Sequence, residues 1–331
     1  MRIRFMVLAI VLFLLLPGAF AQDEDKAPCD RTCLENYVDR YLELMEVNDP
    51  SLEFFTRDCK FTENGVQLPL GGEGLWYSMS GRGTYRFYVP DVETQQIAYI
   101  GTVREGGGMP AKKAQGSKPA AKPSEGTLAA VAIRLKINDD GKVSEAEQLV
   151  IRRETSLSPP QENAPPPPPS TADRVEQMGA PNPIFAEVIP EAERMSREEL
   201  VEVGNYYFEG LQRNDTKGYY PFTDDCVRFE NGMLSTRECK KQFSDGSLRN
   251  IVSRIRDRRF VAVDRERGIA FAFGFFDHYS INWTWQLAEL FKIEKGNIRR
   301  IEAVFQRCPF GMNSGWSTYE QGMSEERQSI R

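Results

Sequence analysis

The sequence predicts an α+β protein made of two tandem domains of the same kind. The first observation is a recurring segment: residues 58–65 read DCKFTENG and residues 225–232 read DCVRFENG, an offset of 167 residues (232 − 65 = 167). The second is an amphipathic helical stretch before each copy, and the third is a set of strand-like runs after each copy. A shared order of elements at a nearly fixed offset is typical of an internal duplication.

A helix is predicted at the start of each domain. Residues 34–47 and 200–213 carry apolar side chains at helical spacing. Each stretch ends at an Asn-Asp pair that begins with Asn48 or Asn214, which is a helix stop signal.

The strands of the two domains align at two further offsets. Residues 86–91 align with 259–264 at an offset of 173, and residues 134–137 align with 290–293 at an offset of 156. The offset falls by 17 (173 − 156 = 17) because the first domain carries an insertion at residues 106–126. This insertion is almost entirely Gly, Ala, Lys, Pro and Ser, and therefore predicts a flexible loop between two strands.

The N-terminus has the pattern of a secretory signal peptide. Two arginines precede an apolar run at residues 5–16, and Ala19-Phe20-Ala21 supplies the small residues of a cleavage site. We therefore expect residues 1–21 to be removed and the protein to be exported, to a periplasm or to the medium. No later segment is apolar enough to enter a membrane.

The remaining boundaries follow from composition. The first domain is expected over residues 22–155, a Pro-rich linker over 156–190, the second domain over 191–316 and a polar C-terminal tail over 317–331. Polyproline holds an extended conformation, so the linker is predicted to act as a spacer.

Composition also excludes several classes of function. The net charge of the 331 residues is −6 without a long basic stripe, which argues against nucleic acid as a partner. The single His and the lack of any CxxC pair give no metal site. Because nucleotide-binding glycine loops are also missing, we expect no cofactor. The expected partner is a small organic ligand.

The six cysteines of an exported chain predict disulfides, although six cysteines allow 15 pairings. Cys29 and Cys33 lie one helical turn apart, and Cys226 and Cys239 flank a short loop. The other two, Cys59 and Cys308, either pair across the domains or stay free.

Several motifs together carry a resemblance that covers nearly the whole mature chain. They are CDRTC at Cys29–Cys33, FTENG at Phe61–Gly65, GLW at Gly74–Trp76, RDRR at Arg256–Arg259, FFDH at Phe275–His278, AELFK at Ala288–Lys292 and PFGMNSGW at Pro309–Trp316. With these motifs the chain resembles an exported double-repeat family of bacterial and fungal proteins, described as a domain of unknown function. The N-terminal helices packed on a curved antiparallel sheet resemble the cone-shaped fold of nuclear transport factor two and the SnoaL-like enzymes.

This resemblance implies a cone fold in which the sheet wraps around the helices and leaves a pocket at its wide end. It also implies the bridges Cys29–Cys33 and Cys226–Cys239, but it brings no established activity. SnoaL-like enzymes perform acid–base chemistry with Asp/His pairs and no metal or nucleotide.

The candidate catalytic residues are Asp277, His278 and Glu289, all in the second domain. Aligned with the first domain, they replace Arg104, Glu105 and Ile133. Adjacent strands are expected to bring the three to one end of the cavity, with His278 as acid and base, Asp277 orienting it and a buried Glu289 as second carboxyl. In the alternative interpretation His278 caps a strand and Glu289 pairs with a nearby arginine.

Five residues are candidates for ligand binding. Arg256 and Arg258 suit an anionic group, Trp285 suits stacking, and Glu230 and Asn231 could line the cavity. The recurrence of Glu-Asn-Gly in both domains also fits a shared hairpin turn.

Two functions follow from these features. The first is an exported, cofactor-independent lyase, hydratase or isomerase whose site lies in the second domain. The second is a non-catalytic exported module for ligand binding or interaction, in which the two domains pair through their sheet faces.

Overall fold

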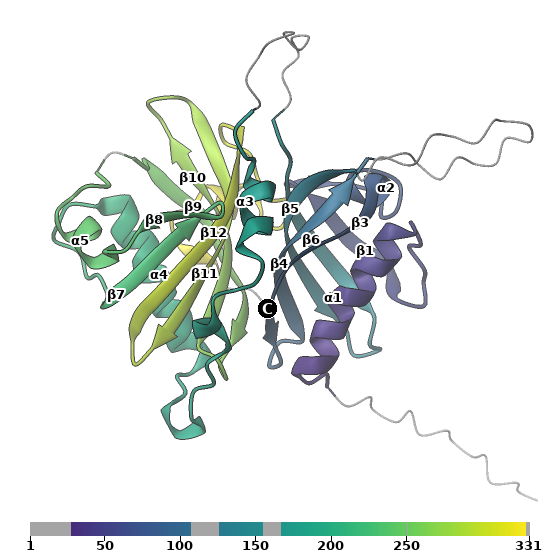
Figure 1. The fold of residues 1–331 in the computed structure, drawn as a ribbon, viewed down its shortest axis with the longest axis horizontal. Helices are drawn as coiled ribbons and strands as arrows, with labels where there is room; N and C mark the ends of the chain where they lie inside the picture. Colours follow the sequence, from purple (N-terminus) through teal and green to yellow (C-terminus); the bar gives the residue numbers. More distant parts are fainter. Residues whose placement is uncertain (1–27, 107–125, 155–166, 250, 329–331) are drawn as a thin grey trace, which may run out of the picture.

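The computed structural model describes residues 28–106, 126–154, 167–249 and 251–328 (Figure 1). The predicted signal peptide, residues 107–125 of the predicted insertion and residues 155–166, which include the first part of the predicted linker, lie outside these ranges. No helix in the described ranges is long and apolar enough to cross a membrane.

The first domain is a helix packed on a six-stranded sheet. Its elements are α1 (Arg31–Glu46), β1 (Phe55–Glu63), β2 (Val66–Gln67), α2 (Leu75–Ser78), β3 (Met79–Asp91), β4 (Gln96–Glu105), β5 (Thr127–Ile137) and β6 (Val143–Ile151). The strand order is β2-β1-β6-β5-β4-β3, and β1 and β6 are the one parallel pair of this sheet among the described residues.

The second domain has the same order of elements. They are α4 (Arg197–Arg213), β7 (Phe222–Glu230), β8 (Met233–Thr236), α5 (Cys239–Ser244), β9 (Arg254–Asp264), β10 (Ile269–His278), β11 (Trp283–Glu294) and β12 (Asn297–Pro309). The strand order β8-β7-β12-β11-β10-β9 repeats that of the first sheet, with β13 (Arg327–Gln328) added beside β9. The α+β fold class with two tandem domains is therefore as predicted.

Each sheet has an inner face that packs on its own helix and a contact face that packs on the other domain. The inner faces bury α1 and α4, whose N-termini are capped by Asp30 and by a capping box of Ser196 and Glu199. The contact faces meet at the middle of the molecule (Figure 1), where Phe87 and Ile100 join Phe271 in one apolar cluster.

Ion pairs between the domains follow an approximate two-fold relation. Arg31, at the start of α1, donates to Asp264 at the end of β9 (2.6 Å), and Arg197, at the start of α4, donates to Asp91 at the end of β3 (2.8 Å). Arg31 and Arg197 are equivalent residues of the two helices in the sequence repeat, and Asp91 and Asp264 are equivalent residues of the two strands. Such a reciprocal contact is the pattern of a two-fold interface.

The predicted spacer contains ordered structure that binds both domains. Residues 170–193 include α3 (Thr171–Met178) and the 3-10 turns η1 (Pro183–Ala186) and η2 (Glu191–Glu193). Val175 and Phe185 are buried in the apolar cluster between the sheets. The composition of the segment did not predict α3, because a short helix needs few apolar residues to pack on a sheet. The N-terminus of α3 is stabilised by a capping box of Ser170 and Asp173.

The segment predicted as a polar tail also contains regular structure. It forms α6 (Tyr319–Met323) and β13, which pairs in parallel with β9. Just before it, Trp316 crosses to the first domain and donates from Nε1 to Thr62 Oγ1 (2.8 Å).

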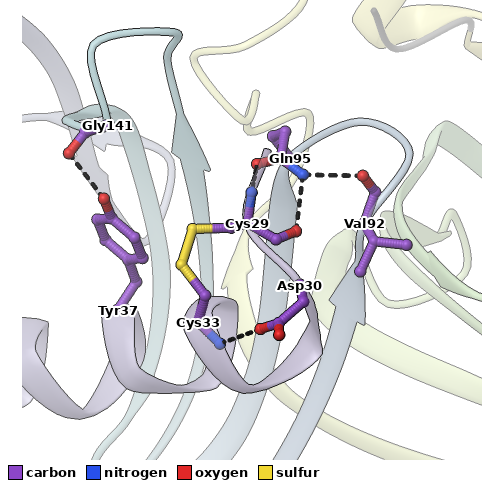
Figure 2. The surroundings of a disulfide bond; sticks show 7 residues. All are labelled: Cys29, Asp30, Cys33, Tyr37, Val92, Gln95 and Gly141. Carbon is purple, nitrogen blue, oxygen red and sulfur yellow. Dashed lines mark hydrogen bonds between the residues drawn. A yellow bond between two sulfur atoms is a disulfide. The ribbon is translucent and has the colours of Figure 1, made fainter. Parts of the chain in front are cut away.

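Both disulfides implied by the family resemblance are present, as Cys29–Cys33 and Cys226–Cys239, while Cys59 and Cys308 are free. Figure 2 shows the first bridge at the start of α1. Gln95 of the β3–β4 turn accepts a hydrogen bond from the amide of Cys29 (2.7 Å) and donates to the carbonyl of Cys29 (3.0 Å). The bridge and these hydrogen bonds fix the beginning of the helix to the sheet.

Candidate functional site

Asp277 and His278 are neighbours at the end of β10, so their side chains lie on opposite faces of the sheet. Asp277 points to the contact face, where Oδ2 accepts from Arg256 Nε (2.9 Å) and Oδ1 accepts from Thr284 Oγ1 (2.7 Å). Burial works to raise the pKa of Asp277, but these hydrogen bonds and those from Arg254 outweigh it and hold the pKa below its usual value. Asp277 therefore does not orient His278, contrary to the prediction.

His278 lies on the inner face but far from Glu289. In the pairing of β10 with β11, His278 is opposite Trp283, and Glu289 is opposite Ala272. Six residues along β11 separate Trp283 from Glu289 (289 − 283 = 6), which is ~20 Å at ~3.3 Å per residue. The three predicted catalytic residues therefore do not share one site: strand alternation separates Asp277, and distance separates His278 from Glu289.

Arg256 and Arg258 also diverge, because β9 bulges at Asp257, where φ is +50°. Arg256 faces the C-terminal segment and donates to the carbonyl of Met312 (2.8 Å). Arg258 faces α4 and donates from Nη2 to Gln212 Oε1 (3.0 Å). The predicted anion site built from both arginines is thus not formed, and neither arginine pairs with Glu289.

Asn231 forms the tight turn between β7 and β8. Its φ is +51°, and its Oδ1 accepts from the amide of Phe305 (2.8 Å). In the first domain Asn64 has the same φ, +51°, and accepts from the amide of Val150 (2.7 Å). The shared Asn-Gly motif is therefore a clamp that ties each hairpin turn to the neighbouring long strand, as the structural interpretation expected.

A second group of polar side chains surrounds Glu289 on the inner face of β11. We call Glu289, Tyr207 of α4, and Arg228 and Glu230 of β7 the Glu289 cluster. Arg228 donates from Nη1 to the hydroxyl of Tyr207 (3.1 Å), and its Nε lies 3.6 Å from Glu230 Oε1. Glu289 is 1% exposed, whereas the Glu230 side chain is 31% exposed and connects the cluster to the surface.

The electrostatics of the cluster favour a protonated Glu289. Burial is the main cause and the charge of Glu230 adds to it, so the pKa of Glu289 rises to about 8 against the opposing effects of Arg228 and Tyr207. Glu289 Oε2 has no hydrogen-bond partner. A neutral carboxyl with an unpartnered oxygen is able to donate or accept a proton.

The first domain has a polar row at the same position, and there it is fully hydrogen-bonded. In the first domain one row of paired residues crosses β1, β6, β5 and β4 and consists, in that order, of Glu63, Gln148, Ile133 and Tyr99. The equivalent row of the second domain crosses β7, β12, β11 and β10 and consists of Glu230, Ala303, Glu289 and Ala272. Glu63 accepts from the amide of Leu75 (2.7 Å) and from Gln148 Nε2 (2.9 Å), and it pairs with Arg152 (2.8 Å). Gln148 in turn accepts from the hydroxyl of Tyr41 (3.1 Å).

Tyr207 and Arg228 were not predicted as functional residues. Tyr207 lies within residues 200–213, for which the sequence predicts only an amphipathic helix. Arg228 carries a signal in the sequence, because at the offset of 167 it stands where the first domain has the buried Phe61 (228 − 167 = 61). The same comparison between domains that selected Glu289 also selects Arg228.

The described residues contain no group of three or more His, Cys, Asp and Glu side chains placed to hold a metal ion. The Glu289 cluster itself offers two carboxyls, one phenol and one guanidinium. The set thus places a proton donor, a second carboxyl and a cation in one cluster.

Among the solved structures that resemble this chain, three examples each match about one third of it. An M. tuberculosis LEH-like epoxide hydrolase is 14% identical, with 33% of this chain and 84% of that chain covered and a TM-score of 0.27. A protein of unknown function with a cystatin-like fold from Methylobium petroleophilum PM1 is 18% identical (34% and 78% covered, TM-score 0.28). AusH from Aspergillus nidulans is 11% identical (34% and 86% covered, TM-score 0.28).

No curated protein sequence matches the chain. One family model does match, that of the "Domain of unknown function (DUF8021)", over residues 193–305. This range contains α4 and β7 to β11, and with them every member of the Glu289 cluster.

Proposed function

We propose that the second domain is a cofactor-independent acid–base catalyst, a lyase, hydratase or isomerase, that acts on a small organic ligand in an exported protein. The observation that carries the proposal is the buried Glu289 carboxyl, of which one oxygen has no hydrogen-bond partner. Buried polar atoms without partners are uncommon in native proteins, and carboxyls whose pKa is strongly shifted by burial and a charged neighbour cluster at functional sites.

The Glu289 cluster supplies complementary roles for a proton transfer. Glu289 holds its proton at neutral pH because its pKa is about 8, and it gives that proton to a ligand oxygen. Glu230, which is partly exposed, accepts a proton from the adjacent carbon of the ligand. Glu289 thus loses one proton and Glu230 gains one, while the C–H bond of the ligand breaks and an enol forms. Return of a proton from Glu230 to a neighbouring carbon, and of the hydroxyl proton to Glu289, completes an isomerisation.

Arg228 and Tyr207 position and balance the charge in this scheme. The guanidinium of Arg228 lies between Tyr207 and Glu230, so it stabilises the carboxylate that Glu289 becomes after proton transfer. His278 has no part in this step because it lies opposite Trp283, six residues along β11 from Glu289.

The test is proton exchange at carbon. The full mature chain is incubated in D₂O with a panel of small ketones and β-hydroxy carbonyl compounds, and loss of C–H signals is followed by NMR. Glu289→Gln is expected to slow exchange by a factor of ~100 or more, the usual range for loss of a general acid or base.

Glu302→Gln is the matched control, because Glu302 is also buried on a neighbouring strand but faces the other domain and bonds to Arg300 and Tyr85. It is expected to keep the wild-type rate. Equal rates in wild type and Glu289→Gln, or no exchange across the whole panel, would count against the proposal.

A further inference from the structure

A groove of about 840 Å³ lies at the ends of β6, β11 and β12, beside the proline segment at residues 167–169. Its volume is in the range of ~300–1,000 Å³ that is typical of small-molecule sites. The groove is separate from Glu289, which lies four residues along β11 from the lining residue Trp285 (289 − 285 = 4), or ~13 Å at ~3.3 Å per residue.

One wall of the groove is aromatic and held in place. Trp285 and Phe305 stack with ring centroids 4.9 Å apart and planes inclined by 27°. The ring of His278 contacts Trp285 at 4.3 Å, with planes inclined by 61°. Because Trp285 touches two rings, its rotation is restricted, and it presents a fixed flat surface for stacking.

The charge of the lining is positive. Arg152, Arg153 and Arg307 line the groove, and Glu154 is the one acidic residue of the lining. The first two arginines already have carboxylate partners elsewhere in the chain.

Arg307 is the arginine that remains available. Its guanidinium lies 4.0 Å from the centre of the Trp283 ring, and the residue is exposed. Within the described ranges it has no carboxylate partner. The indole ring fixes the position of the guanidinium and leaves its N–H groups free to bind an anion.

We propose that this groove binds a small planar aromatic carboxylate, whose ring stacks on the Trp285–Phe305 wall and whose carboxylate pairs with Arg307. Binding at this place requires no proton transfer, so it does not depend on the role proposed for Glu289.

Isothermal titration of the full mature chain with 2-naphthoate tests the proposal. Arg307→Gln is expected to weaken binding ~10-fold or more, because it removes the cation but alters only an exposed side chain. Trp285→Leu is expected to weaken binding by a similar factor through loss of the stacking surface. Lys240→Gln, which removes an exposed cation outside the groove, is expected to leave the affinity unchanged.

Two further ligands define the chemistry. The neutral analogue 2-naphthalenemethanol is expected to bind at least ~10-fold more weakly, about 1.4 kcal/mol, because it lacks the carboxylate. Galacturonate has a carboxylate on a saturated ring and is also expected to bind more weakly. The proposal is overturned if 2-naphthoate does not bind, if Arg307→Gln binds it as well as wild type does, or if galacturonate binds more tightly. Retained binding in Glu289→Gln would separate this site from the proposed catalysis.

Discussion

The two domains place polar side chains at the same position of their inner faces but bond them differently. In the first domain Glu63 accepts two hydrogen bonds and pairs with Arg152, and Gln148 links it to Tyr41. In the second domain Glu230 keeps the position of Glu63, but Ala303 replaces Gln148, and Glu289 replaces Ile133 as a second carboxyl whose Oε2 has no partner.

The difference suggests that one fold serves two purposes in this chain. A fully bonded buried network stabilises and rigidifies a core, whereas a partly bonded one costs free energy. Such a cost is expected where function requires it. In the function proposed above, the first domain serves as a structural partner and the second domain carries the chemistry.

The strongest test compares the same substitution at equivalent positions, Glu63→Ala and Glu230→Ala. Glu63→Ala is expected to lower the free energy of unfolding by ~3 kcal/mol, because it leaves the buried amide of Leu75 and Gln148 Nε2 without their acceptor and takes from Arg152 one of its two carboxylate partners. Glu230→Ala is expected to cost less than ~1 kcal/mol, because Glu230 is partly exposed and its nearest cation contact is 3.6 Å. Urea denaturation measures both. Equal losses would show that the two polar rows do not differ in the way described.

The second test uses pH. The pKa of Glu289 in the folded protein, about 8, lies above the value of ~4.3 for an unfolded chain. The folded state therefore keeps a proton that the unfolded chain releases between these values. The stability due to this group is complete below the unfolded pKa and is lost as pH rises through the folded one.

Glu289→Gln removes this dependence. Compared with wild type, the variant is expected to have nearly the same free energy of unfolding at pH 4 and to be more stable by ~2 kcal/mol or more at pH 9. Denaturation of both proteins across this pH range provides the measurement. A constant difference between them would mean that the folded pKa of Glu289 is not raised.

The smallest effect tests what the domains share. Asn64→Ala and Asn231→Ala each remove one side-chain clamp at a residue with φ of +51°. Each is expected to cost ~1–2 kcal/mol, from the lost hydrogen bond and from the left-handed backbone that Ala adopts less readily. Thermal unfolding of both variants should give similar losses, and a large difference would break the structural equivalence of the two turns.

Much of the architecture could be read from local sequence. Asn-Gly turns, strand alternation and helix stop signals are properties of a few neighbouring residues. The strands of the two domains that align in the sequence also pair in the same register, because Ile133 lies opposite Gln148 and Glu289 lies opposite the equivalent residue Ala303. Alternation along β10 likewise places Asp277 and His278 on opposite faces of the sheet, which adjacent positions in a strand already imply.

Other features had no local signal. The bulge at Asp257 sends Arg256 and Arg258 to different faces, although their spacing of two predicts one face. The docking of α3 between the sheets depends on a surface that exists only after both domains have folded.

The sequence by itself determined the α+β class, the tandem order of elements and the residue that is out of place, Glu289, because these depend on periodicity and on comparison between the domains. Only the tertiary structure decided which groups meet Glu289. Its neighbours Tyr207 and Arg228 come from a helix and a strand far away in the chain, and they approach it because packing on the inner face brings α4 and β7 to β11.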